Sequence, residues 1–114
     1  MTPAGLDRTL AALADSTRRS AVDLLRKKPR RAGDLARELA MSQPAMSRHL
    51  RVLREAGLIE EGEGDGDDAR VRVYRLRQKP FAALRQWAEE VEAFWGEQLE
   101  SFKEHVERAA KARK

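Results

Sequence analysis

The chain has 114 residues, with 23 Lys and Arg, 19 Asp and Glu, and no cysteine. This length predicts a single domain, residues 1–114, with a modest core and no separate catalytic domain. The lack of cysteine excludes disulfides, thiolate metal sites and thiol redox sensing, and it fits a reducing compartment.

The positive charge is concentrated at the front of the chain. Residues 1–58 hold 12 Lys and Arg against 6 Asp and Glu, whereas residues 59–80 hold 5 against 6 and residues 81–114 hold 6 against 7. A localised basic surface favours a polyanion such as DNA as the partner. There is no apolar run of about 18 residues and no signal-peptide pattern, so we expect a soluble, cytoplasmic protein with no membrane contact.

Two helices are predicted at the start. The first rests on three leucines at helical spacing, Leu6, Leu10 and Leu13. It is expected to end near Asp15, which suits the cap of the next helix. The second helix is predicted from Ser16 to Lys28, with Pro29 as its stop. Its expected core residues are Val22, Leu24 and Leu25.

A cluster of cations follows at the end of this second helix: Arg26, Lys27, Lys28, Arg30 and Arg31. Cations here complement the negative end of the helix dipole, which is a structural role. They are equally suited to contact DNA phosphates, and both interpretations stay open. The candidate phosphate contacts among them are Lys27, Arg30 and Arg31.

Residues 32–57 have the pattern of a helix-turn-helix. The short first helix has its own apolar set, Leu35, Ala36 and Leu39, and a three-residue linker at 40–42 predicts a tight corner. The second helix begins at the N-cap Ser42, whose hydroxyl is expected to accept from the Ala45 amide, and ends at Gly57.

The second helix of this pair divides into two faces. At about 100° per residue, Met46, Leu50 and Leu53 fall in one sector and are predicted to face the core. The opposite side carries Gln43, Pro44, Ser47, Arg48, Arg51, Arg54 and Glu55. Gln, Ser and Arg can pair with base edges, and guanidinium groups hold phosphates. We therefore interpret this face as a DNA-reading surface, with Arg51 and Arg54 on phosphates.

Residues 58–77 predict a β-hairpin, or wing, with strands at 58–61 and 71–76 around the turn GEGDGDDA. The turn carries Glu63, Asp65, Asp67 and Asp68, which a DNA backbone should repel. Any contact of the wing with phosphate is therefore expected from Arg70 or Arg72. The acidic spacing lacks the alternating ligands of a calcium loop, so a solvated turn is favoured.

One long amphipathic helix is predicted at 81–109, because apolar residues recur every three or four positions. Its stripe includes five aromatic residues, Phe81, Trp87, Phe94, Trp95 and Phe102, more than a small core readily covers. We expect a second copy of the chain to bury part of it, and packing against the first helix is the alternative. The candidate interface residues of this helix are Leu84, Trp87, Val91, Phe94, Trp95, Leu99 and Phe102.

Several segments together make the chain similar to the ArsR-type winged-helix repressors: LADSTRR at 13–19, GDLA at 33–36, SQPAMSRHL at 42–50, LREAGLI at 53–59 and VYRLR at 73–77. These are small bacterial dimers that bind operator DNA and release it on a signal. The resemblance implies that the first helix, with Leu6, Leu10 and Leu13, joins the last one in the dimer interface. It also implies that the residues entering the major groove include Gln43, Ser47 and Arg48, with Ser42 and His49 near the backbone. Pro44 completes the candidate base-reading set.

The family's metal sites have no counterpart here. Where a cysteine-rich motif opens the third helix of metal sensors, this chain has Arg31, Ala32 and Gly33. In the last helix the only imidazole is His105, and a lone histidine among glutamates favours a solvated residue. The resemblance therefore implies a metal-independent member without a cofactor.

The sequence as a whole predicts a mainly helical winged helix-turn-helix with a small hairpin and a long dimerisation helix. Its predicted function is a homodimeric, sequence-specific regulator that binds double-stranded DNA, a repressor on an inverted-repeat operator. Two alternatives are a protein-interaction module and a repressor that responds to an unknown small-molecule inducer at the dimer interface, near Trp87, Trp95 and the first helix. No nucleophile–base pair suggests an enzyme.

Overall fold

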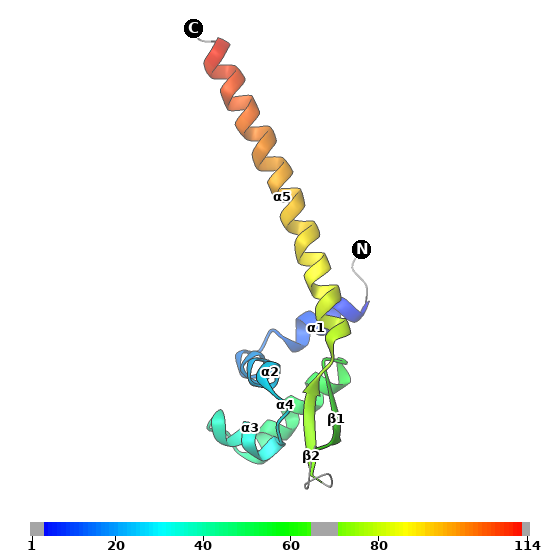
Figure 1. The fold of residues 1–114 in the computed structure, drawn as a ribbon. Helices are drawn as coiled ribbons and strands as arrows, with labels where there is room; N and C mark the ends of the chain where they lie inside the picture. Colours follow the sequence, from blue (N-terminus) through cyan, green and yellow to red (C-terminus); the bar gives the residue numbers. More distant parts are fainter. Residues whose placement is uncertain (1–3, 65–70, 113–114) are drawn as a thin grey trace. The chain divides into compact units, whose positions relative to one another are not determined.

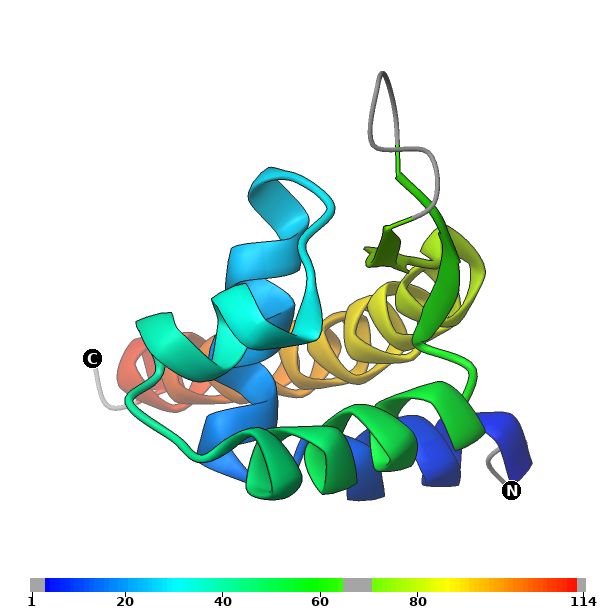
Figure 2. The same cartoon turned by 90° about the horizontal axis from the view of Figure 1, so that it is seen from below.

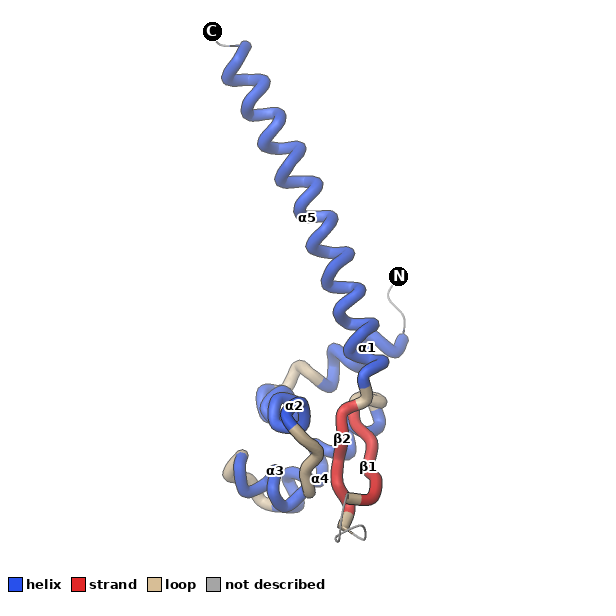
Figure 3. Tube along the Cα trace, in the orientation of Figure 1, coloured by secondary structure: helices blue, strands red, loops and turns tan. Residues whose placement is uncertain are grey.

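The computed structural model describes residues 4–64 and 71–112. In chain order its elements are α1 (Ala4–Ala12), α2 (Ser16–Lys27), α3 (Ala32–Glu38), α4 (Gln43–Glu55), β1 (Ile59–Glu63), β2 (Arg72–Leu76) and α5 (Gln78–Ala112) (Figures 1 and 3). The chain forms two compact units, residues 1–82 and 83–114.

The core of the first unit lies among the end of α1, the helices α2, α3 and α4, and the start of β1. The predicted inward face of α4 is confirmed, since Met46, Leu50 and Leu53 are all at most 1% exposed. The prediction for α2 is partly wrong: Leu25 is buried, but Val22 and Leu24 are only half-buried at the edge of the core. The small side chain of Ala21 is fully buried and takes the inward position on α2 instead. Burial of this apolar set drives the packing of the three helices.

The first helix ends at Ala12, earlier than the expected end near Asp15. Side chains from the following helix reach back to this end. The Arg18 Nε donates to Ala12 O, in the last residue of α1, at 2.6 Å, and the Arg19 Nη1 donates to Leu13 O, one residue beyond it, at 2.7 Å. Asp15 caps α2 as predicted, because its carboxylate accepts from the Arg18 amide at 3.0 Å.

A tight turn joins α3 to α4, and both helices are visible with it in Figure 2. Ala40 takes a left-handed conformation with φ of 53°, and the Met41 amide donates to Ala36 O at 2.8 Å. At the far end of α4, Gly57 has φ of 81° and ends the helix as predicted. The Leu58 amide then donates to Leu53 O, so Leu58 packs back into the core.

The hairpin is antiparallel, with Ile59 opposite Leu76 and Glu63 opposite Arg72. The first strand extends to Glu63, two residues beyond the predicted end at 61, because pairing with β2 continues that far. The second begins at Arg72, one residue later than expected. The acidic residues Asp65, Asp67 and Asp68, together with Arg70, lie outside the described residues. The arrangement is a winged helix-turn-helix.

The last helix runs for 35 residues from Gln78, three positions before the predicted start. Pro80 lies in its first turn, where the missing N–H is tolerated. The rise of an α-helix gives α5 a length of about 50 Å. None of its residues is buried. No described helix is both long and apolar enough to span a membrane.

Candidate nucleic-acid interface

The start of α4 is set by its cap. Ser42 has extended backbone angles, and its Oγ accepts from the Ala45 amide at 3.2 Å, as the sequence predicts. Pro44 stands in the first turn, where no backbone donor is needed. This cap fixes where α4 begins and therefore which side chains follow on its outer face.

The outer face of α4 is exposed along its whole length. The four candidate base-reading residues, Gln43, Pro44, Ser47 and Arg48, are all exposed at the first two turns. They share the N-terminal part of the helix, the part that meets base edges when such a helix enters a major groove. Gln43 also lies close to α3, since a Cβ added at Gly33 would stand 3.4 Å from its Nε2.

The candidate phosphate contacts divide into two groups. Lys27, Arg51 and Arg72 are exposed, and Arg31 is exposed at the N-cap of α3. Arg54 is also exposed, but its Nη1 lies 3.2 Å from the Glu61 Oε2. Arg51 and Arg72 therefore present their guanidinium groups more openly than Arg54 does.

Arg30 does not fit the expected phosphate contact. Its side chain is only 11% exposed, its Nη1 is 2.5 Å from the Glu38 Oε1, and its Nε donates to Leu24 O at 3.2 Å. Its backbone pairs with Tyr74 in both directions, at 3.2 and 2.8 Å. Arg30 therefore fastens the linker between α2 and α3 to the hairpin, and we assign it a structural role.

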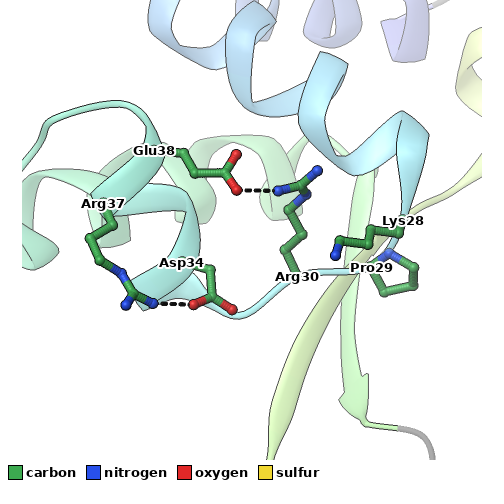
Figure 4. Close-up of a pocket in the computed structure, with 6 residues that line it drawn as sticks. All are labelled: Lys28, Pro29, Arg30, Asp34, Arg37 and Glu38. Atoms are coloured by element: carbon green, nitrogen blue, oxygen red, sulfur yellow. Dashed lines mark hydrogen bonds and ion pairs between the residues drawn. The ribbon is translucent and has the colours of Figure 1, made fainter.

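A pocket of about 550 Å³ opens beside Arg30, lined by Lys28, Pro29, Arg30, Asp34, Arg37 and Glu38. Figure 4 shows two ion pairs among the charged residues of the pocket, Arg30 with Glu38 and Arg37 with Asp34, while Lys28 pairs with none of the residues drawn. Both carboxylates already face a guanidinium, so the pocket offers neither an open cation cluster for phosphate nor a ligand set for a metal.

His49 lies at the edge of the buried side of α4, as expected, but its neighbours were not predicted. Its Nδ1 is 3.4 Å from the Arg18 Nη1 and 3.9 Å from the Asp15 Oδ1. The hydrogen bond from the Arg18 amide lowers the pKa of Asp15 below its ordinary value. Arg18 was not predicted to take part in the site, and its signal in the sequence was its position three residues after the capping Asp15 in the segment LADSTRR.

Comparison with known proteins decides the family. The family model described as "Bacterial regulatory protein, arsR family" matches residues 15–61, which include α2, α3 and α4. The chain is also 39% identical over 101 residues to the HTH-type transcriptional regulator Rv2034 of Mycobacterium tuberculosis, covering 89% of this chain and 88% of that protein. The chain belongs to the ArsR family of bacterial regulatory proteins.

Solved structures agree with this assignment of the ArsR fold. An ArsR-like transcriptional regulator from Rhodococcus sp. RHA1 is 29% identical, with a TM-score of 0.73 over 89% of this chain and 92% of that one. The homodimeric winged helix-turn-helix DNA-binding domain Mb0332 of Mycobacterium bovis, residues 1–100, is 26% identical. Its TM-score is 0.59 over 78% of this chain and 79% of that domain. The relatives are transcriptional regulators, which are not enzymes.

A metal site in an ArsR chain needs several ligating side chains close together. Within residues 4–64 and 71–112, no three His, Asp or Glu side chains lie close enough together to hold a metal ion. His105 is exposed on α5, as the sequence predicts for a solvated residue.

The candidate dimer residues differ widely in exposure. On α1, Leu6 is buried within the single chain and Leu13 is half-buried against the core, so only Leu10 offers substantial surface. On α5, Leu84 and Trp87 are half-buried, whereas the exposed apolar residues are Val91, Phe94, Trp95, Leu99, Phe102 and Val106. Phe94 and Trp95 meet edge to face, with ring centroids 6.3 Å apart. The exposed stripe thus runs along α5 from Val91 onward.

Proposed function

We propose that this ArsR-family chain is a homodimeric repressor that binds an inverted-repeat operator through the major groove. The observation that carries the proposal is the outer face of α4, where Gln43, Ser47 and Arg48 are exposed side by side above a buried apolar face. Amide, hydroxyl and guanidinium groups can form the paired hydrogen bonds that distinguish base edges.

The roles along this surface follow from chemistry and exposure. Gln43 and Arg48 read bases, because their planar groups can make two parallel hydrogen bonds to one base. Arg51 and Arg72 hold phosphates, with further contacts from Lys27, Arg31 and Arg54. The Ser42 hydroxyl caps α4 and is expected to hold that helix's first turn against the DNA backbone.

Dimerisation is proposed through the exposed apolar stripe of α5, with Leu10 of α1 as a further contact. Six large apolar side chains in sequence at helical spacing favour burial against a second copy. The Mb0332 domain, which is homodimeric and binds DNA, supports the same assembly here. Two-fold symmetry would place two copies of α4 about 34 Å apart, one helical turn of DNA.

We also propose that the regulator works without a metal, since the described residues offer no metal-ligand cluster. Its proposed location is the cytoplasm, where a bacterial DNA-binding regulator meets its operator. A small-molecule inducer is an additional hypothesis. Both tryptophans of the chain, Trp87 and Trp95, lie on α5 and serve as probes for it. Quenching of their fluorescence by a metabolite, together with release of DNA, would support an inducer, whereas quenching without release would argue against one.

The test is selection of bound sites from a random pool of double-stranded DNA, followed by affinity measurements against salt. Recovery of an inverted repeat, with a steep fall of affinity as salt rises, supports the proposal. Recovery of no motif contradicts it and leaves two alternatives, non-specific DNA binding or a protein-interaction module.

A further inference from the structure

The side chain of Arg18, on α2, contacts two other helices, α1 and α4. From α2 it reaches the end of α1, where its Nε donates to Ala12 O at 2.6 Å and its Nη2 donates to Ala11 O at 3.4 Å. Its remaining terminal nitrogen, Nη1, lies 3.4 Å from the Nδ1 of His49 on α4. One guanidinium thus touches both α1 and the candidate DNA-reading helix.

The chemistry of this contact fixes the form of the histidine ring. A guanidinium carries only donors, so Nδ1 of His49 must be the acceptor. The ring proton then lies on Nε2. Asp15, the only carboxylate that pairs with this ring among the described residues, is 3.9 Å from Nδ1, too far for a hydrogen bond. The Arg18 contact therefore selects one of the two neutral tautomers.

Arg19 provides a matched comparison one residue along the chain. Its Nη1 also donates to a carbonyl at the end of α1, Leu13 O one residue beyond the helix, at 2.7 Å, and its side chain is exposed. The two arginines therefore carry the same charge and both bind carbonyls at the end of α1. The difference is the contact with His49, which Arg18 makes and Arg19 does not.

We infer that Arg18 is a positioning residue for operator recognition: its guanidinium ties the C-terminal carbonyls of α1 to the ring of His49 and thereby fixes the orientation of α4. This inference rests on the proposed function of α4. His49 follows Arg48 directly, so a small rotation of α4 at His49 moves a base-reading side chain. Recognition needs such groups held within about 0.5 Å of their working geometry, which a second layer of contacts provides.

The first test uses the histidine ring itself. The protein has only two histidines, so ¹⁵N spectra at pH 8 can resolve His49, with the exposed His105 as an internal reference. We expect the proton of His49 on Nε2 in the wild type, and a loss of that preference in Arg18→Met. In Arg19→Met the signal should stay unchanged. A wild-type proton on Nδ1 would overturn the inference.

The second test measures affinity for the selected operator duplex and for a random duplex of equal length. Arg18→Met should weaken operator binding about tenfold, the scale of a hydrogen bond to a charged group, with random DNA affected no more than in Arg19→Met. Arg18→Lys should recover only part, because one ammonium cannot reach all three acceptors. Equal operator affinity in Arg18→Met and Arg19→Met would refute the inference.

A pair of variants at His49 keeps the test decisive if Arg18→Met does not fold. Asn places an acceptor oxygen near the position of Nδ1, so His49→Asn should keep the preference for operator over random DNA, whereas His49→Leu should lose it. If His49→Leu instead lost affinity equally on the operator and the random duplex, His49 would only hold a phosphate, and the inference would be wrong. If the wild type selects no operator, the proposed function has failed instead, and the ring signal alone decides the Arg18 contact.

Discussion

Arg54 and Glu61 connect the last turn of the candidate DNA-reading helix to the first strand of the wing. The Arg54 Nη1 lies 3.2 Å from the Glu61 Oε2, with the two side chains 49% and 30% exposed. A pair this exposed contributes at most about 1 kcal/mol, so a DNA phosphate can displace the carboxylate. Burial raises the pKa of Tyr74, the residue opposite Glu61 in the hairpin, and the Glu61 carboxylate raises it further.

Replacing Glu61 by Gln should therefore strengthen DNA binding. The change releases Arg54 for phosphate, and we expect an affinity gain of about two- to fivefold at low salt that shrinks as salt rises. Fluorescence anisotropy at two salt concentrations measures it. Glu60→Gln removes the same charge from the neighbouring exposed position and serves as the control. An equal gain in both variants would show that only net charge matters.

Ala40→Gly should stabilise the protein. Ala40 holds φ of 53° in the turn between α3 and α4, a conformation that strains a residue with a Cβ. Glycine adopts it without that strain, and we expect a gain of about 0.5–1 kcal/mol in the free energy of unfolding, measured in urea. Gly57→Ala is the reverse change and serves as the control. Gly57 has φ of 81° and an added Cβ would meet no atom within 4 Å, so any loss of stability comes from the backbone conformation. A destabilised Ala40→Gly would contradict this reading.

Asp15 should make stability depend on pH in the acid range. Its pKa is lowered from 3.8, chiefly by the hydrogen bond from the Arg18 amide. A lowered pKa in the folded state means that the stabilisation is full above about pH 3.8 and disappears as the pH falls through the folded value. Asp15→Asn keeps an acceptor but does not titrate. The drop in melting temperature from pH 6 to pH 3 should therefore be larger for the wild type than for this variant. Asp23→Asn removes one carboxylate elsewhere on α2 and is the control for charge.

Trp95→Glu should separate the two copies of the chain. Trp95 is 60% exposed in the single chain, so the charge leaves the core of residues 1–82 intact while opposing burial of the α5 stripe. Sedimentation should show a monomer, and operator affinity should drop about a hundredfold as the second half-site is lost. Ala93→Glu places the same charge on the opposite side of α5. A dimeric Trp95→Glu protein would rule out this interface.

The features of α4 were predictable because they are local. Met46, Leu50 and Leu53 repeat with the helix period, and the Ser42 cap and Gly57 stop follow from the chemistry of helix ends. The same holds for the existence of the hairpin and of the long last helix. Each of these signals lies within a few residues of the element it specifies.

The contacts of the arginines were not predictable for the opposite reason. Arg30 was a candidate for either a structural role or a phosphate contact. In the structure it pairs with Glu38 eight residues away, and its backbone pairs with Tyr74 of β2. Arg18 meets His49 at a separation of 31 residues. The sequence around a charged residue does not show whether its side chain faces solvent or a distant partner. The packing of the helices determines which of the two occurs.

The measurement that tests the central claim most directly compares Arg48→Ala with the wild type on the selected operator and on random DNA. If α4 reads bases, the substitution should cost about 1–3 kcal/mol on the operator and relax specificity at one position in each half-site, with little change on random DNA. An equal loss on both duplexes would show that Arg48 holds only the backbone, and the account of α4 as the base-reading helix would be wrong.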